Sequence, residues 1–347
     1  MIVDDSQIAR AVLSRMVSAH RDIEVAATAG NAAEALEALK SLRVDIVLLD
    51  VEMPGTSGLE ALPDILRKGH GARVLIVSSA TEDGAEATVR ALALGASDTL
   101  PKPGAGTFGG RFSETLAERI RAIGRVARQA PAPAIPLAAV PEPPPMTLRP
   151  MPEHRVGCLA LGASTGGLHA LSEFLRALPR EIGAPILITQ HLPASFMPFF
   201  ARQIEAASGR LTRVAEDGQP LHPEQILIAP GDAHLELTRH GGRVNVRLSR
   251  EPVTSGCTPS VDPMFWSLGE NYGKSGLGVV FSGMGRDGLV GSARLVSQGG
   301  AVIVQDQDSS AVWGMPRAVA EAGLASAILP PADLARRVAA RAEAGRV

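Results

Sequence analysis

A serine lies in a short glycine-rich segment, Gly162-Ala-Ser-Thr-Gly-Gly167, between an apolar run at residues 156–161 and a helical pattern that begins at Leu168. The apolar run has the length of a buried strand, so Ser164 is expected on a strand-to-helix turn. Glycines on both sides permit a sharp left-handed backbone, which would point the hydroxyl outward and turn backbone N–H groups toward an oxyanion. This is the setting of a nucleophile. The residues also fit an anion-binding turn, or a Ser164 or Thr165 cap on the next helix, so the loop alone leaves these alternatives open.

A nucleophilic hydroxyl needs a general base, and histidine is the usual one. Of the eight histidines, His191 directly follows a buried-strand pattern, at residues 186–190, and should therefore share the sheet edge of Ser164. His169 is the rival base, but it lies five residues after Ser164 on the following helix, where helix geometry turns it away. We predict that His191 is the base.

An acidic residue that orients the imidazole would complete the set. Asp287 follows the apolar strand 277–282, in the segment Gly283-Met-Gly-Arg-Asp-Gly288, so it should reach the same edge. The glycines around Met284 would free backbone N–H groups for an oxyanion. Asp287 could instead cap the next helix. The alternative acids are Asp262 and Asp306.

A second cluster of candidate functional residues lies nearer the N-terminus. Asp4 and Asp5 follow a short apolar pair, Asp50 follows the strand 46–49, and Ser78 and Lys102 end later strands. Carboxylates gathered at one sheet edge repel each other unless a cation lies among them, and their hard oxygens suit Mg²⁺. The lysine and the hydroxyl could then hold a phosphoryl group. Capping of the first helix by Asp4 or Asp5 is the alternative, but it explains neither Asp50 nor Lys102.

The elements that position these residues alternate between short apolar strands and helical patterns in both halves of the chain. This alternation is typical of doubly wound parallel sheets, whose sites lie at the carboxyl ends of the strands. In the first half the expected strands are residues 2–3, 23–28, 46–49, 74–78 and 98–101. In the second half they are 156–161, 185–189, 226–229, 277–282, 301–305 and 327–329, with a β-hairpin formed by 234–238 and 244–248. We therefore predict two α/β domains.

A proline-rich stretch separates the halves, because nine of the 29 residues at 125–153 are proline. Such a stretch resists packing and favours polyproline II, so it tethers the domains without fixing how they dock. The predicted organisation is a first domain at 1–124, a linker at 125–153 and a second domain at 154–347.

Composition excludes several classes of function. The formal net charge of −2 offers no basic surface for nucleic acid, and an aromatic content of 3% removes the stacking platforms of single-strand binders. The two cysteines, Cys158 and Cys257, form neither a disulfide framework nor a metal-ligand spacing. No apolar run is long enough to insert into a membrane and no signal-peptide layout is present, so we expect a cytoplasmic protein.

The first half resembles a response-regulator receiver domain, which has a flavodoxin-like fold. The motifs are Asp4-Asp-Ser6, Leu49-Asp-Val-Glu-Met-Pro-Gly55, Val77-Ser-Ser79 and Pro101-Lys-Pro103. The resemblance implies that Asp50 is the phospho-acceptor and that Asp4, Asp5 and Asp50 hold Mg²⁺. It also makes Ser78 and Lys102 the switch residues. One departure is Thr99, where receivers commonly have an aromatic that rotates on phosphorylation.

The whole chain resembles the chemotaxis response-regulator methylesterases, the CheB family. Its motifs in the second half are Gly162–Gly167, Gln190-His191, Pro259-Ser-Val-Asp-Pro263, Gly283–Gly288, and Asp306 through Val312-Trp-Gly-Met-Pro316. By this resemblance Ser164, His191 and Asp287 form a catalytic triad and the Met284 backbone contributes to the oxyanion hole.

The resemblance also implies a reaction and its control. The substrates would be glutamate γ-methyl esters on the cytoplasmic helices of chemoreceptors, with deamidation of glutamines as a second activity. A chemotaxis-type histidine kinase would donate the phosphate, the receiver would cover the active site until Asp50 is phosphorylated, and the catalytic domain would need no cofactor.

A competing hypothesis is a receiver joined to a dinucleotide- or phosphate-binding module that performs no hydrolysis. The loop Gly162–Gly167 would then cradle phosphate. An acidic ribose ligand about 20 positions further on is missing, and His191 occupies the comparable place. A receiver with a DNA-binding output does not fit the charge or the parallel α/β pattern.

Overall fold

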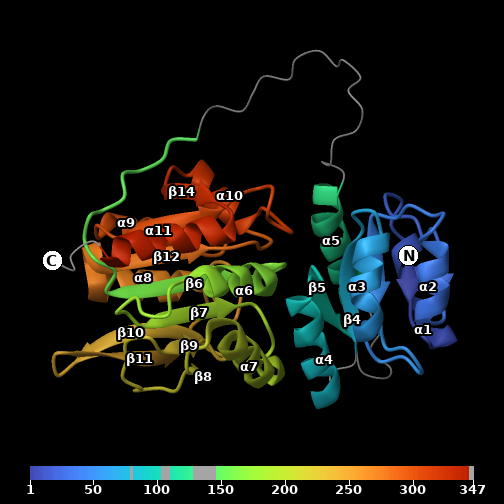
Figure 1. Ribbon diagram of the computed structural model, residues 1–347, viewed down its shortest axis with the longest axis horizontal. Coiled ribbons are helices and arrows are strands. Elements are labelled where there is room, and N and C mark those ends of the chain that lie inside the picture. The colour runs from blue at the N-terminus through green and yellow to red at the C-terminus, as the bar shows by residue number, and fades with distance from the viewer. Residues whose placement is uncertain (79–80, 103–109, 128–145, 344–347) are drawn as a thin grey trace, which may run out of the picture. The chain divides into compact units, whose positions relative to one another are not determined.

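The chain forms two compact units, Met1–Pro141 and Glu142–Val347, each with its own parallel sheet (Figure 1). The computed structural model describes residues 1–78, 81–102, 110–127 and 146–343. The two predicted α/β folds are confirmed. Within the described ranges, every helix is too short or too polar to span a lipid bilayer.

The N-terminal unit has five parallel strands in the order β2-β1-β3-β4-β5, which is the flavodoxin-like arrangement. The strands are β1 (Ile2–Val3), β2 (Thr28–Ala29), β3 (Ile46–Leu49), β4 (Arg73–Ser78) and β5 (Asp98–Pro101). The helices are α1 (Gln7–Ser18), α2 (Ala32–Ala38), α3 (Gly58–Lys68), α4 (Glu82–Ala93) and α5 (Gly110–Ala127). Because the strands are parallel, Asp4 after β1, Asp50 after β3 and Lys102 after β5 reach the same edge.

The first helix is capped by Ser6 and not by an aspartate. The Ser6 hydroxyl accepts the N–H of Ala9 at 3.2 Å, which satisfies one of the free N–H groups of the first turn. Asp4 lies before the cap, where its Oδ1 accepts the N–H of Ser6 at 2.9 Å. The alternative that Asp4 or Asp5 serves as the helix cap is therefore wrong.

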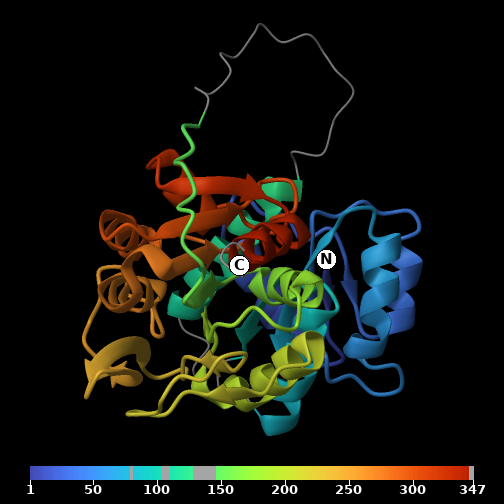
Figure 2. The same ribbon diagram turned by 60° about the vertical axis from the view of Figure 1, so that its left-hand side comes forward.

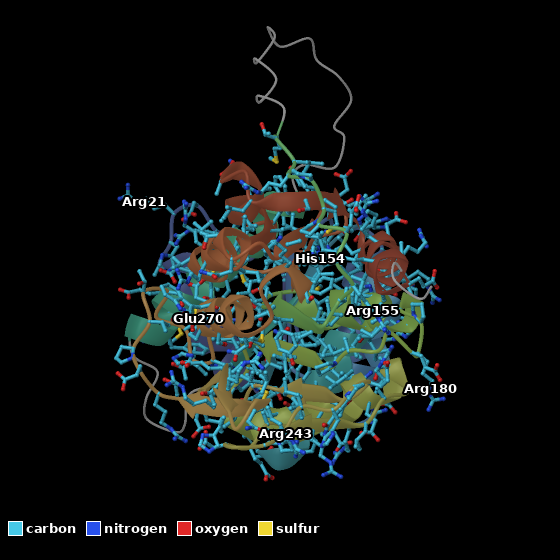
Figure 3. The ribbon with its side chains drawn as sticks, turned by 90° about the vertical axis from the view of Figure 1, so that its left-hand side faces the viewer. Arg21, His154, Arg155, Arg180, Arg243 and Glu270 are labelled. Atoms are coloured by element: carbon cyan, nitrogen blue, oxygen red, sulfur yellow. The ribbon has the colours of Figure 1, made fainter. Side chains whose placement is uncertain are left out.

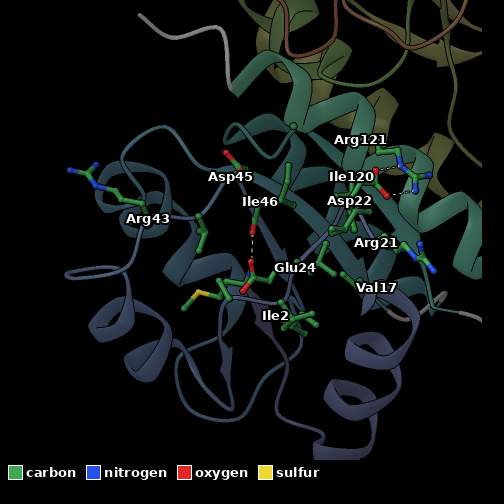
Figure 4. Close-up of a pocket in the computed structure, with 17 residues that line it drawn as sticks. Ile2, Val17, Arg21, Asp22, Glu24, Arg43, Asp45, Ile46, Ile120 and Arg121 are labelled. Carbon is green, nitrogen blue, oxygen red and sulfur yellow. Dashed lines mark hydrogen bonds and ion pairs between the residues drawn. The ribbon is translucent and has the colours of Figure 1, made fainter. Parts of the chain in front are cut away.

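The strand predicted at residues 23–28 is mostly absent. β2 contains only Thr28 and Ala29, because the short β1 provides a partner for these two residues alone. A cavity of about 540 Å³ lies beside β1 and is lined by the segments before β2 and β3 (Figure 4). At its wall the Met1 nitrogen donates to the Ile46 carbonyl at 2.9 Å.

The C-terminal unit has seven parallel strands in the order β14-β13-β12-β6-β7-β9-β8. The strands are β6 (Cys158–Ala163), β7 (Ile186–Gln190), β8 (Thr212–Val214), β9 (Ile226–Ile228), β12 (Gly276–Val280), β13 (Ala301–Gln305) and β14 (Ala325–Leu329). The helices are α6 (Gly167–Ala177), α7 (Met197–Ser208), α8 (Val261–Tyr272), α9 (Leu289–Ser297), α10 (Met315–Glu321) and α11 (Pro331–Glu343). The edge strand β8 was not predicted, because its three residues give too short a pattern.

Helices cover both faces of this sheet. Right-handed crossovers place α6 and α7 on one face, where α11 joins them, and α9 and α10 on the other with α8 (Figures 1 and 2). Fully buried strand residues such as Leu187 and Val280 fill the interior, and Phe174 meets Phe281 edge to face at 5.2 Å. Charged side chains such as Arg180 lie at the periphery (Figure 3).

The predicted hairpin is present as β10 (His234–His240) and β11 (Arg243–Ser249), which pair antiparallel. Its turn consists of Gly241 and Gly242, with φ values of 56° and 80°. A two-residue turn with both φ angles positive matches the twist of the strands, and glycine adopts it without a steric cost.

The structure describes both ends of the predicted linker. α5 continues to Ala127, and the N–H of Arg149 donates to the Ala325 carbonyl of β14 at 2.9 Å. Helix α5 therefore extends three residues beyond 124, and residues before 154 contact the second unit. Most of the proline-rich stretch, 128–145, lies outside the described residues.

Candidate active site and phosphorylation site

Three neighbouring strands carry the candidate catalytic residues of the C-terminal unit. β6 lies between β7 and β12, with Ala163 paired to Gln190 and Gly162 paired to Val280. Ser164 follows β6 and His191 follows β7, while Asp287 lies in the loop after β12. From β6 the chain continues to β7 on one side and later returns to β12 on the other. A doubly wound sheet leaves a crevice for ligands where the strand order reverses in this way.

The backbone at Ser164 makes a tight turn that requires glycine. Gly166 has φ +74°, and a Cβ there would lie 2.3 Å from Ala311 Cβ. The Ser164 carbonyl accepts the N–H of Gly167 at 2.8 Å and the side-chain amide of Gln190 at 2.9 Å. The N-cap of α6 is Gly166, which has no side chain to cap the helix, so the alternative of a Ser164 or Thr165 cap is wrong.

Ser164, His191 and Asp287 form one hydrogen-bonded chain. The Ser164 Oγ lies 3.1 Å from Nδ1 of His191, and Nε2 of His191 lies 2.8 Å from Oδ2 of Asp287. An ionised carboxylate can only accept, so in the neutral imidazole Nε2 carries the ring proton and Nδ1 presents its lone pair to the serine. The arrangement can pass a proton from Ser164 to His191 while Asp287 holds the ring.

Asp287 is buried at 2% exposure and is held by more than the histidine. Its Oδ1 accepts the Ser260 hydroxyl at 2.6 Å, and its Oδ2 also accepts the N–H of Val261 at 2.7 Å. Burial by itself raises the pKa of Asp287, but the hydrogen bonds and the charge of His191 outweigh burial and lower the pKa to about 2. The carboxylate is therefore ionised at neutral pH.

The surroundings of His191 favour its charged form. Burial of the ring lowers the pKa of His191, but the hydrogen bond to Asp287 and the nearby Cys257 sulfur outweigh it, so the pKa lies well above 6.5. The imidazolium that forms when the ring takes up a proton is thus stabilised by a fixed negative charge.

None of the rival residues takes the place of His191 or Asp287, although Asp262 lies close enough to Asp287 for their charges to interact. His169 is exposed on α6, as helix geometry predicts. Asp262 accepts the N–H of Gly291 at 2.8 Å, and burial followed by the charge of Asp287 raises its pKa to about 6. Asp306 accepts the N–H of Ser309 at 3.2 Å within its own turn. Neither acid is hydrogen-bonded to His191 in the part of the chain that the structure describes.

Backbone N–H groups lie close to the serine on the β12 side. A Cβ on Gly283 would lie 2.8 Å from Ser164 Cβ, so the backbone of this loop approaches the serine as only glycine allows. Met284 comes next, and among the described residues no hydrogen-bond acceptor is paired with its N–H. Met284 itself is 39% exposed.

The N-terminal unit gathers its carboxylates at one edge, as predicted. One oxygen each of Asp4, Asp5 and Asp50 lie within 4.8 Å of one another. Lys102 Nζ lies 2.5 Å from Asp50 Oδ2 and 2.8 Å from Asp4 Oδ2. The Ser78 hydroxyl is buried, and no partner for it lies in the described part of the chain.

Charge at this edge is unbalanced. Burial, and to a smaller extent the charge of Asp4, raise the pKa of Asp50, although Lys102 acts in the opposite direction. A divalent cation would relieve this repulsion, and three carboxylate oxygens are ligands that suit Mg²⁺. An added phosphoryl group on Asp50 would supply the acceptor that the Ser78 hydroxyl lacks. The residues present therefore fit both groups.

Comparison with known proteins gives the family. The family model described as CheB methylesterase matches residues 159–338, and the response regulator receiver domain model matches residues 1–107. The chain belongs to the CheB methylesterase family. Its catalytic unit is similar to the crystal structure of the Thermotoga maritima CheB methylesterase catalytic domain, with a TM-score of 0.52 and 32% identity over 53% of this chain and 98% of that one.

Relatives in this family match nearly the whole chain. A protein-glutamate methylesterase/protein-glutamine glutaminase 2 of Caulobacter vibrioides is 41% identical over 346 residues, covering 99% of this chain and 98% of the relative. A similarly named protein of Rhodospirillum rubrum is 40% identical over 362 residues, covering 97% and 93%. The similarity to these relatives therefore spans both the receiver and the methylesterase units of this chain.

Two residues of this CheB-family site were missed at the sequence level. Ser260 was noted only as part of the segment that contains Asp262, yet its hydroxyl holds Asp287. Cys257 was assigned no role, yet one donor atom each of Cys257, His191 and Asp287 lie within 4.8 Å of one another. A serine three residues after a cysteine carries no signal that points across the sheet to a distant aspartate.

Proposed function

We propose that this chain is a protein-glutamate methylesterase that hydrolyses glutamate γ-methyl esters, and also glutamine side-chain amides, on the cytoplasmic helices of chemoreceptors. The hydrogen-bonded path from Ser164 through His191 to Asp287 is the observation that supports it most. The names of the relatives supply the substrate class.

In the first half-reaction Ser164 attacks the side-chain carbonyl of the substrate. Nδ1 of His191 takes the hydroxyl proton as the Oγ–C bond forms, and the imidazolium is stabilised by Asp287. The same proton then passes to the leaving oxygen or nitrogen, which departs as methanol from an ester or as ammonia from an amide. An acyl-enzyme on Ser164 remains.

In the second half-reaction water replaces the leaving group. His191 removes a proton from the water as its oxygen bonds to the acyl carbon, and then returns the proton to Ser164 Oγ as that bond breaks. The products are a glutamate side chain and the free hydroxyl. The negative oxygen of each tetrahedral intermediate would accept the Met284 N–H, a contribution of about 3 kcal/mol if it resembles other oxyanion holes.

The test of this activity is release of methanol from a methylated chemoreceptor preparation. Ser164→Ala should abolish release while Asp50 still takes up phosphate from a small-molecule phosphodonor, which shows that the N-terminal unit is intact. Turnover that persists in purified Ser164→Ala protein would refute the role of this serine.

We further propose that Asp50 accepts a phosphoryl group from a chemotaxis-type histidine kinase. Asp4, Asp5 and Asp50 would hold Mg²⁺, which neutralises phosphate charge during transfer, and Lys102 and Ser78 would contact the phosphoryl oxygens. Because the kinase and the receptor helices lie in the cytoplasm, we expect the chain to act there.

Phosphorylation would control access to Ser164. In this proposal the receiver covers the mouth of the active site, and phosphorylated Asp50 shifts the balance toward an uncovered state. The support is the order of the two units and the proline-rich stretch between them. A truncated protein that begins at Glu142, the start of the second unit, should release methanol faster than the unphosphorylated full chain. Equal or slower methanol release by the truncated protein would rule out inhibition of the active site by the receiver.

A further inference from the structure

A cysteine lies beside the candidate triad. Cys257 is half-buried in the loop before α8, and its sulfur is within 4.8 Å of one donor atom each of His191 and Asp287, which are themselves within that distance of each other. Nitrogen, sulfur and oxygen donors thus converge at one point, although the triad chemistry proposed above needs no thiol.

The loop is held in place by the residues that hold Asp287. Gly256, at φ +68°, turns the chain just before Cys257, and the N–H of Cys257 donates to the Ser255 hydroxyl at 3.4 Å. Ser255 in turn donates to Ser260 Oγ, the same atom that donates to Asp287. The sulfur and the carboxylate are therefore positioned by one small hydrogen-bond network.

The donor set matches one metal ion better than others. Thiolate, imidazole and carboxylate are the usual ligands of Zn²⁺, whereas Mg²⁺ prefers oxygen alone. Bond lengths of about 2.0–2.3 Å place the ligands of a tetrahedral zinc about 3.3–3.8 Å apart. The spacing within 4.8 Å is compatible with this geometry once the 2.8 Å contact of His191 with Asp287 opens by about 0.5 Å.

We propose that His191, Cys257 and Asp287 form a Zn²⁺-binding site, and that bound Zn²⁺ reversibly inhibits the enzyme. As the Zn–S bond forms, the Cys257 thiol releases its proton to solvent, and a water molecule completes the tetrahedron. No oxidant or other co-reactant takes part. Ligand type would determine which metal binds at each site, Zn²⁺ at the triad and Mg²⁺ at the carboxylates of the N-terminal unit.

Inhibition follows from the chemistry of the imidazole ring and depends on the proposed esterase mechanism. If Nε2 binds the metal, the one ring proton must lie on Nδ1, which then points a donor at Ser164. If Nδ1 binds the metal, its lone pair is occupied. In both cases His191 has no free lone pair for the Ser164 proton, so the general base is lost.

Metal binding is tested first, because it does not depend on hydrolysis. Full-length protein is titrated with Co²⁺ in the presence of excess Mg²⁺, and the near-ultraviolet charge-transfer band of cobalt bonded to thiolate is recorded. The chain has two cysteines, so Cys158→Ser is the matched control: Cys158 is buried in β6, and its removal should leave the band unchanged. Cys257→Ser should abolish it.

Zinc affinity is then compared by competition with a coloured chelator. Loss of an outer contact of a metal site costs about 10–100-fold in affinity, so loss of the Cys257 ligand should cost at least about tenfold. A thiolate band that survives in Cys257→Ser, or equal zinc affinity of this variant and the unaltered chain, would overturn the proposed site.

Inhibition is measured separately, with each variant compared with its own zinc-free rate of methanol release. Zn²⁺ should slow the unaltered chain and Cys158→Ser, a chelator should restore the rate, and Cys257→Ser should require at least about tenfold more Zn²⁺. Equal inhibition of all three proteins would overturn the inhibitory role. A complete absence of methanol release with the cobalt band intact would count against the esterase function while leaving the metal site supported.

Discussion

Replacing Asp287 by asparagine should slow hydrolysis far less than the same change does in serine proteases. There, asparagine forces the wrong histidine tautomer and costs about 10⁴-fold. Here Asp287 Oδ2 accepts both the His191 ring proton and the Val261 N–H at 2.7 Å. An asparagine would place its oxygen at that position, because the opposite orientation would set its NH₂ group against the Val261 N–H. The correct tautomer is therefore retained.

The other end of the asparagine can also be satisfied. Its NH₂ group would face Ser260 Oγ, which lies 2.6 Å from Asp287 Oδ1. Ser260 would then accept this N–H and turn its own hydrogen toward Ser255 Oγ, 3.3 Å away. No buried polar group loses its partner, so the variant should fold.

What the variant loses is the negative charge beside the imidazolium. A hydrogen bond to a charged group contributes about 1.5–3 kcal/mol, and each 1.36 kcal/mol changes a rate about tenfold. We therefore expect kcat for methanol release to fall by about 10- to 100-fold. The pH at which the rate reaches half its maximum should also move down, because Asp287 helps to raise the pKa of His191.

The assay is the pH dependence of methanol release by the unaltered chain, Asp287→Asn and Asp287→Ala. Alanine leaves the His191 ring proton and the Val261 N–H without an acceptor, so this variant should be the slowest of the three. A loss of about 10⁴-fold in Asp287→Asn would show that the tautomer had reversed and that the Val261 N–H does not orient the amide.

Four further outcomes are expected. Since His191 must be neutral to act as base and its pKa is raised, methanol release should increase with pH from 6 through 8, and a flat profile would contradict this. Ser260→Ala removes a 2.6 Å hydrogen bond to a buried carboxylate and the cap of α8, so its free energy of unfolding in denaturant should fall by about 2–4 kcal/mol; a change below 1 kcal/mol would argue against both contacts. Gly166→Ala, at φ +74° with Ala311 Cβ 2.3 Å from the added atom, should weaken labelling by a serine-reactive probe, and normal labelling would contradict the turn. Asp50→Asn, or removal of Mg²⁺ by a chelator, should abolish the stimulation of methanol release by a phosphodonor, whereas persistent stimulation would place control elsewhere.

The sequence alone predicts the fold class and the edge of each sheet on which the candidate residues lie. Apolar runs of strand length followed by Ser164, His191 and Asp50 indicate parallel strands, and parallel strands end at a common edge. The hairpin is also predicted from a local pattern, because Gly241 and Gly242 suit the positive φ of a two-residue turn. These are local properties of the chain, so a local pattern is sufficient.

The tertiary structure decided which atoms meet. Only the packing of three strands determines that Nδ1 of His191 faces the serine. The same packing lets Ser260 and Val261, at the start of α8, donate to Asp287. The position of Cys257 beside the His191 ring is likewise decided by the tertiary structure. Such contacts join residues far apart in the chain through side-chain geometry, which leaves no periodic trace in the sequence. The strand expected at 23–28 did not form for a related reason. A strand needs a partner, and β1 pairs only with Thr28 and Ala29.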